Sequence, residues 1–213
     1  YSFLEDTGIK FQIEIHSAPV WVKVYYLNPE TFHTAPMFFL STDVPENDHI
    51  SKTICHRLYD ANESTKIAQY ILLGKGGAKL LDVMNFERDV YHLNEAHGLP
   101  AAFYLLKKFG GDLAKVKEKL VFTTHTPEEA GNEKHNINLC HDMSYFSGLS
   151  LNEVKTIEGV EDDRFNHSLC ALRMARVANG VSQLHGVVSR KMWSKYPGIC
   201  EIKAITNAQD FKY

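Results

Sequence analysis

The sequence lacks the signatures of several large protein classes. Its formal charge is only −3 over 213 residues, and no Lys/Arg cluster marks an expected helix face, which argues against a nucleic-acid partner. No apolar run approaches the length of a membrane-spanning helix and no signal peptide is visible, which argues against a membrane partner. The four cysteines are too widely spaced for a Cys-x-x-Cys pair: Cys55, Cys140, Cys170 and Cys200. Reduced thiols in a cytoplasmic protein are therefore the favoured interpretation.

Common catalytic motifs are also missing from the chain. There is no G-x-S-x-G turn, no Walker phosphate loop and no G-x-G-x-x-G after an expected strand. The glycine-rich stretch "LLGKGGAK" (72–79) lies inside a helical run instead of opening a helix, so it is a weak candidate for a phosphate cradle.

Histidine is abundant, with eleven in the chain, but its spacing does not predict a metal site. A helical zinc pair needs two histidines four apart, whereas His92 and His97 are five apart across a strand-to-helix junction. His125, His135 and His141 add no recognised ligand spacing. We expect no bound metal.

Residue patterns predict a small β-rich element, at about 9–44, before an α/β core, at about 55–205. Three aromatic and β-branched segments predict strands at 9–15, 20–27 and 36–44. From Glu63 the apolar period becomes helical, with Asn62 as a candidate N-cap. Gly76-Gly77 within this helix predicts either a break or a close backbone contact.

The core contains an expected β-α-β unit. A strand at 89–93 precedes a helix that carries Leu99, Phe103 and Leu106 on one face, with Pro100 in its first turn. A second helix at 112–120 leads into a strand at 121–125. The two strands should be parallel neighbours, which places the core in the α/β class with a parallel sheet flanked by helices.

Polar residues cluster where the expected strands end. In an open parallel sheet, ligands bind beyond the carboxyl ends of the strands. A third such place is 177–186, where we expect Asn179-Gly180 to turn the chain and a helix to bury Val181, Leu184, Val188 and Met192. The resulting crevice offers mainly neutral donors and acceptors, which suit sugar hydroxyls: Asn94, Glu95, His97, Thr124, His125, Asn179 and His185. Taken singly, Asn94 and Asn179 read better as capping residues and His185 as a hydrogen-bonded structural histidine.

Four blocks in fixed order resemble the α-glucan phosphorylases, which act on glycogen, starch or maltodextrin, and most closely the bacterial and archaeal branch. They cover roughly two thirds of the chain: "RLYDANESTKIAQYILLGKGG" (57–77), "VYHLNEAH" (90–97), "VFTTHTPEEAGNE" (121–133) and "ANGVSQLHGVVSRKMW" (178–193).

The resemblance implies a Rossmann-like fold, one half of a two-domain GT-B glycosyltransferase. It implies cleavage of a terminal α-1,4 glucosyl bond by orthophosphate, with release of glucose 1-phosphate and retention of configuration. It also implies pyridoxal phosphate held as a Schiff base, whose 5′-phosphate takes part in proton transfer.

Site roles follow from the same resemblance. His185 matches the family's active-site histidine, which contacts the transferred glucosyl residue and is the expected catalytic residue. His125 matches a histidine on the acceptor side of the cleft, and Asn94, Glu95 and His97 match the N-[DE]-x-H block. With Thr124 and Asn179, these are the expected substrate-binding residues.

Other family features have no counterpart here. The glycine-rich substrate-phosphate loop, the cofactor lysine and the phosphate-gripping Lys and Arg are missing, and "AITNAQDFKY" (204–213) resembles the boundary to a second domain. Residues 1–213 are therefore expected to be a piece of a longer protein, the partial N-terminal domain without the C-terminal cofactor domain, inactive alone and without bound pyridoxal phosphate.

Two alternatives stay open. One is a sugar-nucleotide-dependent glycogen or starch synthase, which shares the two-domain architecture, although the histidine-bearing blocks favour a phosphorylase. The other is a non-catalytic glucan-binding module. The sequence also leaves open whether the parent is a homo-oligomer.

Overall fold

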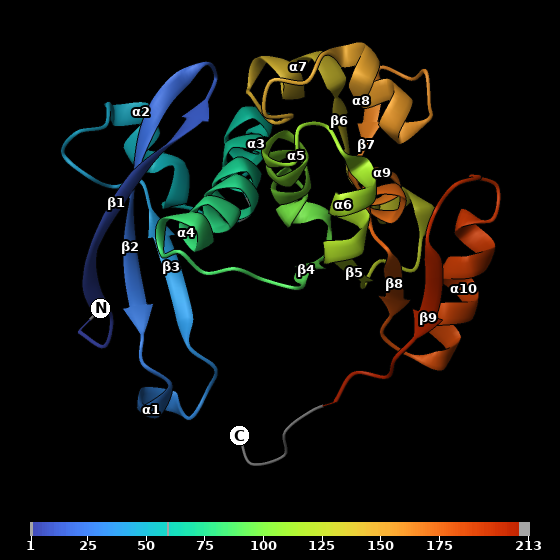
Figure 1. The fold of residues 1–213 in the computed structure, drawn as a ribbon, viewed down its shortest axis with the longest axis horizontal. Coiled ribbons are helices and arrows are strands. Elements are labelled where there is room, and N and C mark those ends of the chain that lie inside the picture. The colour runs from blue at the N-terminus through green and yellow to red at the C-terminus, as the bar shows by residue number, and fades with distance from the viewer. Residues whose placement is uncertain (1, 59, 209–213) are drawn as a thin grey trace.

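A computed structural model describes residues 2–58 and 60–208, and Figure 1 gives their arrangement. An antiparallel sheet and a parallel sheet lie on opposite sides of the helices α3, α4 and α5. Buried side chains from both parts, such as Phe11 and Ile13 of the first sheet and Leu99 and Phe103 beside the second, form one continuous core. The predicted α/β class is confirmed, and the β-rich element shares its core with the α/β part.

The antiparallel sheet has the strand order β1-β2-β3, with strands at Glu5–Ile15, Ala18–Leu27 and Met37–Ser41. Side chains alternate along β1, with Ile13 and Ile15 buried and Glu14 exposed, as expected for a sheet covered on one face. The third strand is shorter than predicted. Beyond Ser41 the chain is held by Asn47, whose side chain bonds the backbone of Trp21 and of Thr42 at 2.8–2.9 Å.

One long helical rod follows. Asn62 caps it as predicted, because its Oδ1 accepts a hydrogen bond from the Thr65 N–H at 3.0 Å. The rod contains α3, one wide π-helical turn and α4, at Glu63–Ile71, Leu72–Gly76 and Gly77–Val83. Gly76-Gly77 does not break it. A Cβ at Gly76 would lie 3.0 Å from the Leu40 side chain, whereas one at Gly77 would meet nothing within 4 Å, so only Gly76 makes a close contact.

The parallel sheet has the order β4-β5-β8-β9, with strands at Tyr91–Asn94, Leu120–Thr124, Val177–Gly180 and Glu201–Ala204. The predicted β-α-β unit is confirmed: β4 and β5 are parallel neighbours joined through α5 (Pro100–Lys108) and α6 (Leu113–Lys119).

The segment between β5 and β8 was not predicted. It forms a small antiparallel pair of strands and three helices, and most of it lies at the top of Figure 1. Its elements are β6 (Lys134–Asn136), α7 (Ile137–Asp142), α8 (Leu151–Glu158), β7 (Arg164–Asn166) and α9 (His167–Met174). Shorter elements are α1 (Pro29–Phe32), α2 (His49–Lys52) and 3₁₀ turns at Thr53–Cys55, Ala96–Gly98 and Glu129–Gly131. No helix of the described chain is long and apolar enough to cross a membrane.

The region after β8 differs from the prediction. Asn179 and Gly180 are the last residues of the strand and do not turn the chain; the helix α10 starts later, at Gln183, and ends at Trp193. This start sets a different buried face: Leu184 is 74% exposed, and the buried residues are His185, Gly186, Ser189 and Trp193. Gly186 faces β9 so closely that a Cβ there would lie 2.6 Å from the Ala204 Cβ. Because only a glycine fits this close to β9, Gly186 determines which face of α10 is buried.

Candidate functional site

The carboxyl ends of three parallel strands meet at one edge of the sheet. Asn94 of β4 pairs in register with Thr123 of β5, and Thr123 pairs with Asn179 of β8. The strand order therefore brings the three predicted polar strand ends together, at the edge where an open parallel sheet binds ligands.

Asn94, Glu95 and His125 form one connected cluster at this edge. The His125 Nε2 and the Asn94 Oδ1 are 2.7 Å apart, and both residues are exposed. The Glu95 carboxylate accepts hydrogen bonds from the His125 backbone N–H and, at 3.3 Å, from the Thr126 hydroxyl. Glu95 thus holds the turn that carries His125.

Glu95 holds this position with an unusual backbone. Its φ of 61° and ψ of 171° lie in a region that is populated essentially by glycine. Strained residues of this kind cluster at functional sites, because the surrounding structure must enforce them.

Thr123, which the sequence did not single out, joins the cluster to the next strand. Its hydroxyl donates to the Asn179 Oδ1 at 2.8 Å, and it lies 2.7 Å from the His92 Nε2. Since its proton goes to Asn179, the oxygen accepts from His92, which places the His92 proton on Nε2. The Asn179 Nδ2 makes only a long 3.4 Å bond to the Gly180 carbonyl, so its donor capacity is largely unused.

His97 lies in a small pocket of about 120 Å³ beside this cluster. Its ring stacks on Tyr70 with centroids 4.9 Å apart. The Tyr70 hydroxyl donates to Glu133, and Lys66 Nζ lies 3.0 Å from the same carboxylate. Burial raises the pKa of Glu133, but these two donors outweigh it and hold the pKa below its usual value, so the carboxylate is charged at neutral pH. The lining is Tyr70, Glu95, Ala96, His97, Thr126, Gly131, Asn132, Glu133, His167 and Ser168.

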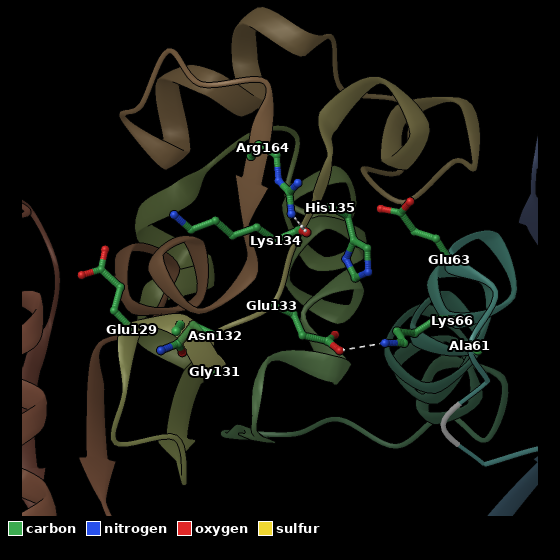
Figure 2. A pocket seen from close by; sticks show the side chains of 11 residues that line it. Ala61, Glu63, Lys66, Glu129, Gly131, Asn132, Glu133, Lys134, His135 and Arg164 are labelled. Atoms are coloured by element: carbon green, nitrogen blue, oxygen red, sulfur yellow. Dashed lines mark hydrogen bonds and ion pairs between the residues drawn. The ribbon is translucent and has the colours of Figure 1, made fainter.

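A larger pocket of about 770 Å³ adjoins the small one and shares Gly131, Asn132 and Glu133 with it. We call it the α3–β6 pocket. Figure 2 shows Lys66 on α3 facing Glu133 across it, with the His135 ring between α3 and β6. Its lining is Ala61, Glu63, Lys66, Glu129, Ala130, Gly131, Asn132, Glu133, Lys134, His135 and Arg164.

Three predicted site residues are buried: Thr124, His185 and, at 9% exposed, Asn179. Thr124 is 1% exposed, and its hydroxyl accepts the Thr126 N–H at 3.3 Å within its own turn. His185 is 7% exposed, and its Nδ1 accepts the Val181 N–H at 3.2 Å, so Nε2 carries the proton. This Nε2 has no partner among the described residues and is sealed from solvent. A sugar could therefore contact Thr124 or His185 only if the chain that covers the side chain moved.

Several residues of the site escaped sequence reasoning. Thr126, Asn132 and Glu133 belong to the polar segment that follows β5, and this polarity was the available signal. Tyr70 and His167 come from distant helices. Tyr70 read as an ordinary residue of a helix face, and nothing in the sequence marked His167. Only the folded chain shows that they share a pocket.

The described ranges contain no group of three or more His, Cys, Asp or Glu side chains arranged to hold a metal ion. The absence of a bound metal stays a prediction.

The fold defines a class of protein. The catalytic domain of starch synthase IV from Arabidopsis thaliana, solved with ADP and acarbose, superposes with a TM-score of 0.69 at 14% identity, over 98% of this chain and 41% of that one. The chain therefore has the fold of part of a GT-B glycosyltransferase catalytic domain, as predicted.

Sequence relatives narrow this class. Maltodextrin phosphorylase of Thermococcus litoralis is 34% identical over 191 residues, 85% of this chain and 22% of the relative. Glycogen phosphorylase of Mycobacterium tuberculosis is 32% identical over 202 residues, 81% of this chain and 23% of the relative. An uncharacterized protein of Methanocaldococcus jannaschii is 46% identical over 213 residues, the whole chain and 40% of the relative. The two phosphorylase matches confirm the resemblance to the α-glucan phosphorylases.

The chain spans less than half the length of each of these relatives. No family model matches it.

Proposed function

We propose that this chain is the sugar-facing wall of an α-1,4-glucan phosphorylase, whose parent protein transfers a terminal glucosyl unit to orthophosphate and releases glucose 1-phosphate with retention. The observation that carries the proposal is the exposed Asn94–His125 pair at the carboxyl edge of the sheet, within a chain similar to named phosphorylases. The substrates are then an α-1,4-glucan and orthophosphate.

The cluster's hydrogen bonds fit a sugar hydroxyl. The His125 Nε2–H donates to the Asn94 Oδ1, which leaves the His125 Nδ1 as an acceptor and the Asn94 amide as a donor. The Asn179 Nδ2 is a further donor on the neighbouring strand. Glu95 acts through His125, because its carboxylate fixes the backbone on which the imidazole sits.

In this proposal, pyridoxal phosphate binds to the parent protein and not to the residues of this chain. The described lysine that is most buried, Lys75, has its pKa lowered by burial, the change that makes an amine suited to Schiff-base formation. However, its Nζ lies 3.3 Å from the Glu14 carbonyl and 3.4 Å from the Ser144 carbonyl, where it bridges β1 and the segment between β5 and β8. Lys75 therefore does not fit a cofactor lysine, and the roles proposed for the residues of this chain involve no step through the cofactor.

His185 can contact the glucosyl unit only if the chain that seals its Nε2 from solvent moves. Its sealed Nε2–H is a donor without an acceptor in the described ranges, and such a group costs about 1–3 kcal/mol. A glucosyl oxygen that reached it would remove this cost.

A second candidate function is a sugar-nucleotide-dependent glucosyltransferase. The observation that favours it is the fold likeness to a starch synthase, a protein whose structure was solved with ADP.

Activity of the full natural protein separates the two. We expect phosphorolysis of maltoheptaose by inorganic phosphate, with no glucosyl transfer from ADP-glucose or UDP-glucose; the reverse pattern would establish the synthase. His125→Ala should lower kcat by roughly a hundredfold with little change in Tm, the scale for loss of one positioned hydrogen-bonding group. The buried His185→Ala should lower Tm, and a catalytic role requires that kcat of the folded fraction also falls and that His185→Asn partly restores it.

A further inference from the structure

The α3–β6 pocket lies outside the strand-end cluster but is connected to it. The small pocket contains Glu95 and His97 of the candidate site, and its other wall, Gly131–Glu133, is also a wall of the larger pocket. A chain-like ligand held at the strand ends could therefore continue into the α3–β6 pocket.

The charges around the α3–β6 pocket are balanced. Its lining carries three basic and three acidic side chains: Lys66, Lys134, Arg164, Glu63, Glu129 and Glu133. Two of the acids are already paired, Glu133 with Lys66 at 3.0 Å and Glu129 with Lys195 at 2.7 Å. A phosphate would meet as many like as opposite charges, and an apolar ligand would strip water from charged groups. An uncharged, hydroxyl-rich ligand meets neither cost.

His135 presents one fixed donor to this pocket. Its Nδ1 lies 2.7 Å from the His167 Nε2, and the His167 Nδ1 lies 2.7 Å from the Tyr145 hydroxyl. The Tyr145 hydroxyl is fully buried and has no other acceptor among the described residues, so its proton goes to the His167 Nδ1; burial also raises its pKa well above the ordinary value, so the proton is kept. His167 then donates to the His135 Nδ1, and the proton of His135 lies on Nε2.

The His135 Nε2–H is unpaired although the side chain is 6% exposed. It makes no hydrogen bond within the described residues, and the side chain lines the α3–β6 pocket. Burial lowers the pKa of His135, so the ring stays neutral at neutral pH and keeps this single donor. Glu133 supplies a matching acceptor, which Tyr70 and Lys66 hold in place.

We propose that the α3–β6 pocket binds an uncharged saccharide, as an additional subsite for the glucan, with the His135 Nε2–H donating to a sugar hydroxyl and the Glu133 carboxylate accepting from one. The inference rests on the proposed function, since it takes the ligand of the strand-end cluster to be a glucan. Its groups are preorganised by buried hydrogen bonds, which reduces the entropic cost of binding.

The test is a titration of the ¹⁵N-histidine-labelled chain with maltoheptaose, observed through the imidazole nitrogens. We expect the His135 and His125 signals to shift together, with the Nε2 tautomer of His135 kept, and no His135 shift with inorganic phosphate. Glu133→Gln should weaken maltoheptaose binding by roughly tenfold, about 1.4 kcal/mol. The control, His141→Gln, changes an exposed side chain outside both pockets and should bind as the unmodified chain does.

A His125 shift without a His135 shift would overturn the subsite and leave the proposed function standing. Shifts of neither ring would overturn the subsite and remove support for glucan binding by this chain. A His135 shift with phosphate alone would replace the saccharide with an anion and overturn the proposal as well. Should Glu133→Gln fail to fold, the NMR shifts of the unmodified chain still decide.

Discussion

The backbone of Glu95 destabilises the fold, whereas its carboxylate stabilises it. Its backbone conformation costs of the order of 1–3 kcal/mol, whereas its carboxylate accepts two hydrogen bonds from the turn that follows β5. A glycine would relieve the backbone but would leave the His125 N–H without this partner. The residue therefore trades local strain for a fixed His125.

Glu95→Gln should loosen the His125 turn without unfolding the chain. The neutral amide oxygen is a weaker acceptor than a carboxylate, by roughly 1 kcal/mol. We expect the His125 amide to exchange its hydrogen several-fold faster, with the Phe122 amide unchanged. Glu128→Gln is a matched control, because the Glu128 side chain enters no hydrogen bond in the described ranges. Equal exchange rates of the His125 amide in both variants would show that Glu95 does not hold the His125 turn.

Glu158 is an ionisable residue that is almost completely buried. It is 1% exposed, its Oε1 accepts the Asn166 N–H at 2.7 Å, and its Oε2 has no partner among the described residues. Burial raises its pKa from 4.5 to about 7. Because the folded pKa exceeds the unfolded one, its contribution to stability is complete below about pH 4.5 and is lost as the pH rises through 7.

Glu158→Gln should therefore stabilise the protein at alkaline pH only. The amide mimics the neutral acid, so the free energy of unfolding at pH 8 should rise by on the order of 2 kcal/mol relative to the unmodified chain. At pH 4.5 the two proteins should differ little. Denaturant unfolding at both pH values measures the difference, and a pH-independent difference would show that Glu158 is charged when folded.

At the scale of residues, sequence reasoning succeeded where the information is local. Asn62 was predicted as a cap because capping depends on a few neighbouring residues. Thr123 and Glu133 were missed because their partners, Asn179 and Tyr70, lie more than fifty residues away. Leu184 was wrongly predicted to be buried, because the buried face of α10 depends on the approach of Gly186 to β9.

At the scale of elements, the rod from α3 to α4 depends on one glycine. A Cβ at Gly74 would lie 2.5 Å from the Gly98 carbonyl oxygen and 2.8 Å from the Ala101 nitrogen, both backbone atoms that cannot rotate away. Gly74 thus sets how closely the π-helical turn packs on the start of α5.

Gly74→Ala and Gly77→Ala should have opposite effects. The first should cost several kcal/mol through overpacking, whereas at Gly77 a Cβ meets nothing within 4 Å and alanine should stabilise the helix by about 0.5–1 kcal/mol. Thermal melts of the two variants provide the measurement. A Gly74→Ala protein with unchanged Tm would show that the contact with α5 is not tight.

The elements that could be predicted share a property. Strands β1, β2, β4 and β5 and the helices between β4 and β5 have a clear apolar period and short connections. The insertion between β5 and β8 has strands of three residues, too short for a periodic signal, and they pair across about thirty residues. Tertiary contacts define them, so a local pattern could not.

At the scale of the whole molecule, buried histidines should make the fold sensitive to acid. Burial lowers the pKa of His135 and places that of His167 well below its ordinary value. Unfolded histidines take up protons at about pH 6.5 while these two do not, so stability falls as the pH falls through this value. Glu158 acts in the opposite direction over part of the same range.

The effect should be measured in the Glu158→Gln background, which removes that opposition. Between pH 7.5 and 5.5 we expect the free energy of unfolding to fall by on the order of 2 kcal/mol, from denaturant titrations. His141→Gln should leave the fall unchanged, and His135→Gln with His167→Gln should reduce it. A flat profile would mean that the two rings become protonated within the folded chain.

The strand order has a consequence for how the chain reaches this structure. The β4–α5–α6–β5 unit closes over about thirty residues, whereas β5 finds β8 only after the intervening fifty or so residues are placed. Bringing distant segments together costs chain entropy before any contact offsets it. During synthesis, β4 and β5 would emerge and pair first, while Thr123 waits for Asn179. The polar edge would then be completed in the last phase of folding, together with the docking of β8. The Thr123 carbonyl accepts the Glu95 N–H, so the Thr123 backbone faces β4, and refolding followed by pulsed hydrogen exchange should protect the Thr123 amide before that of Ala178.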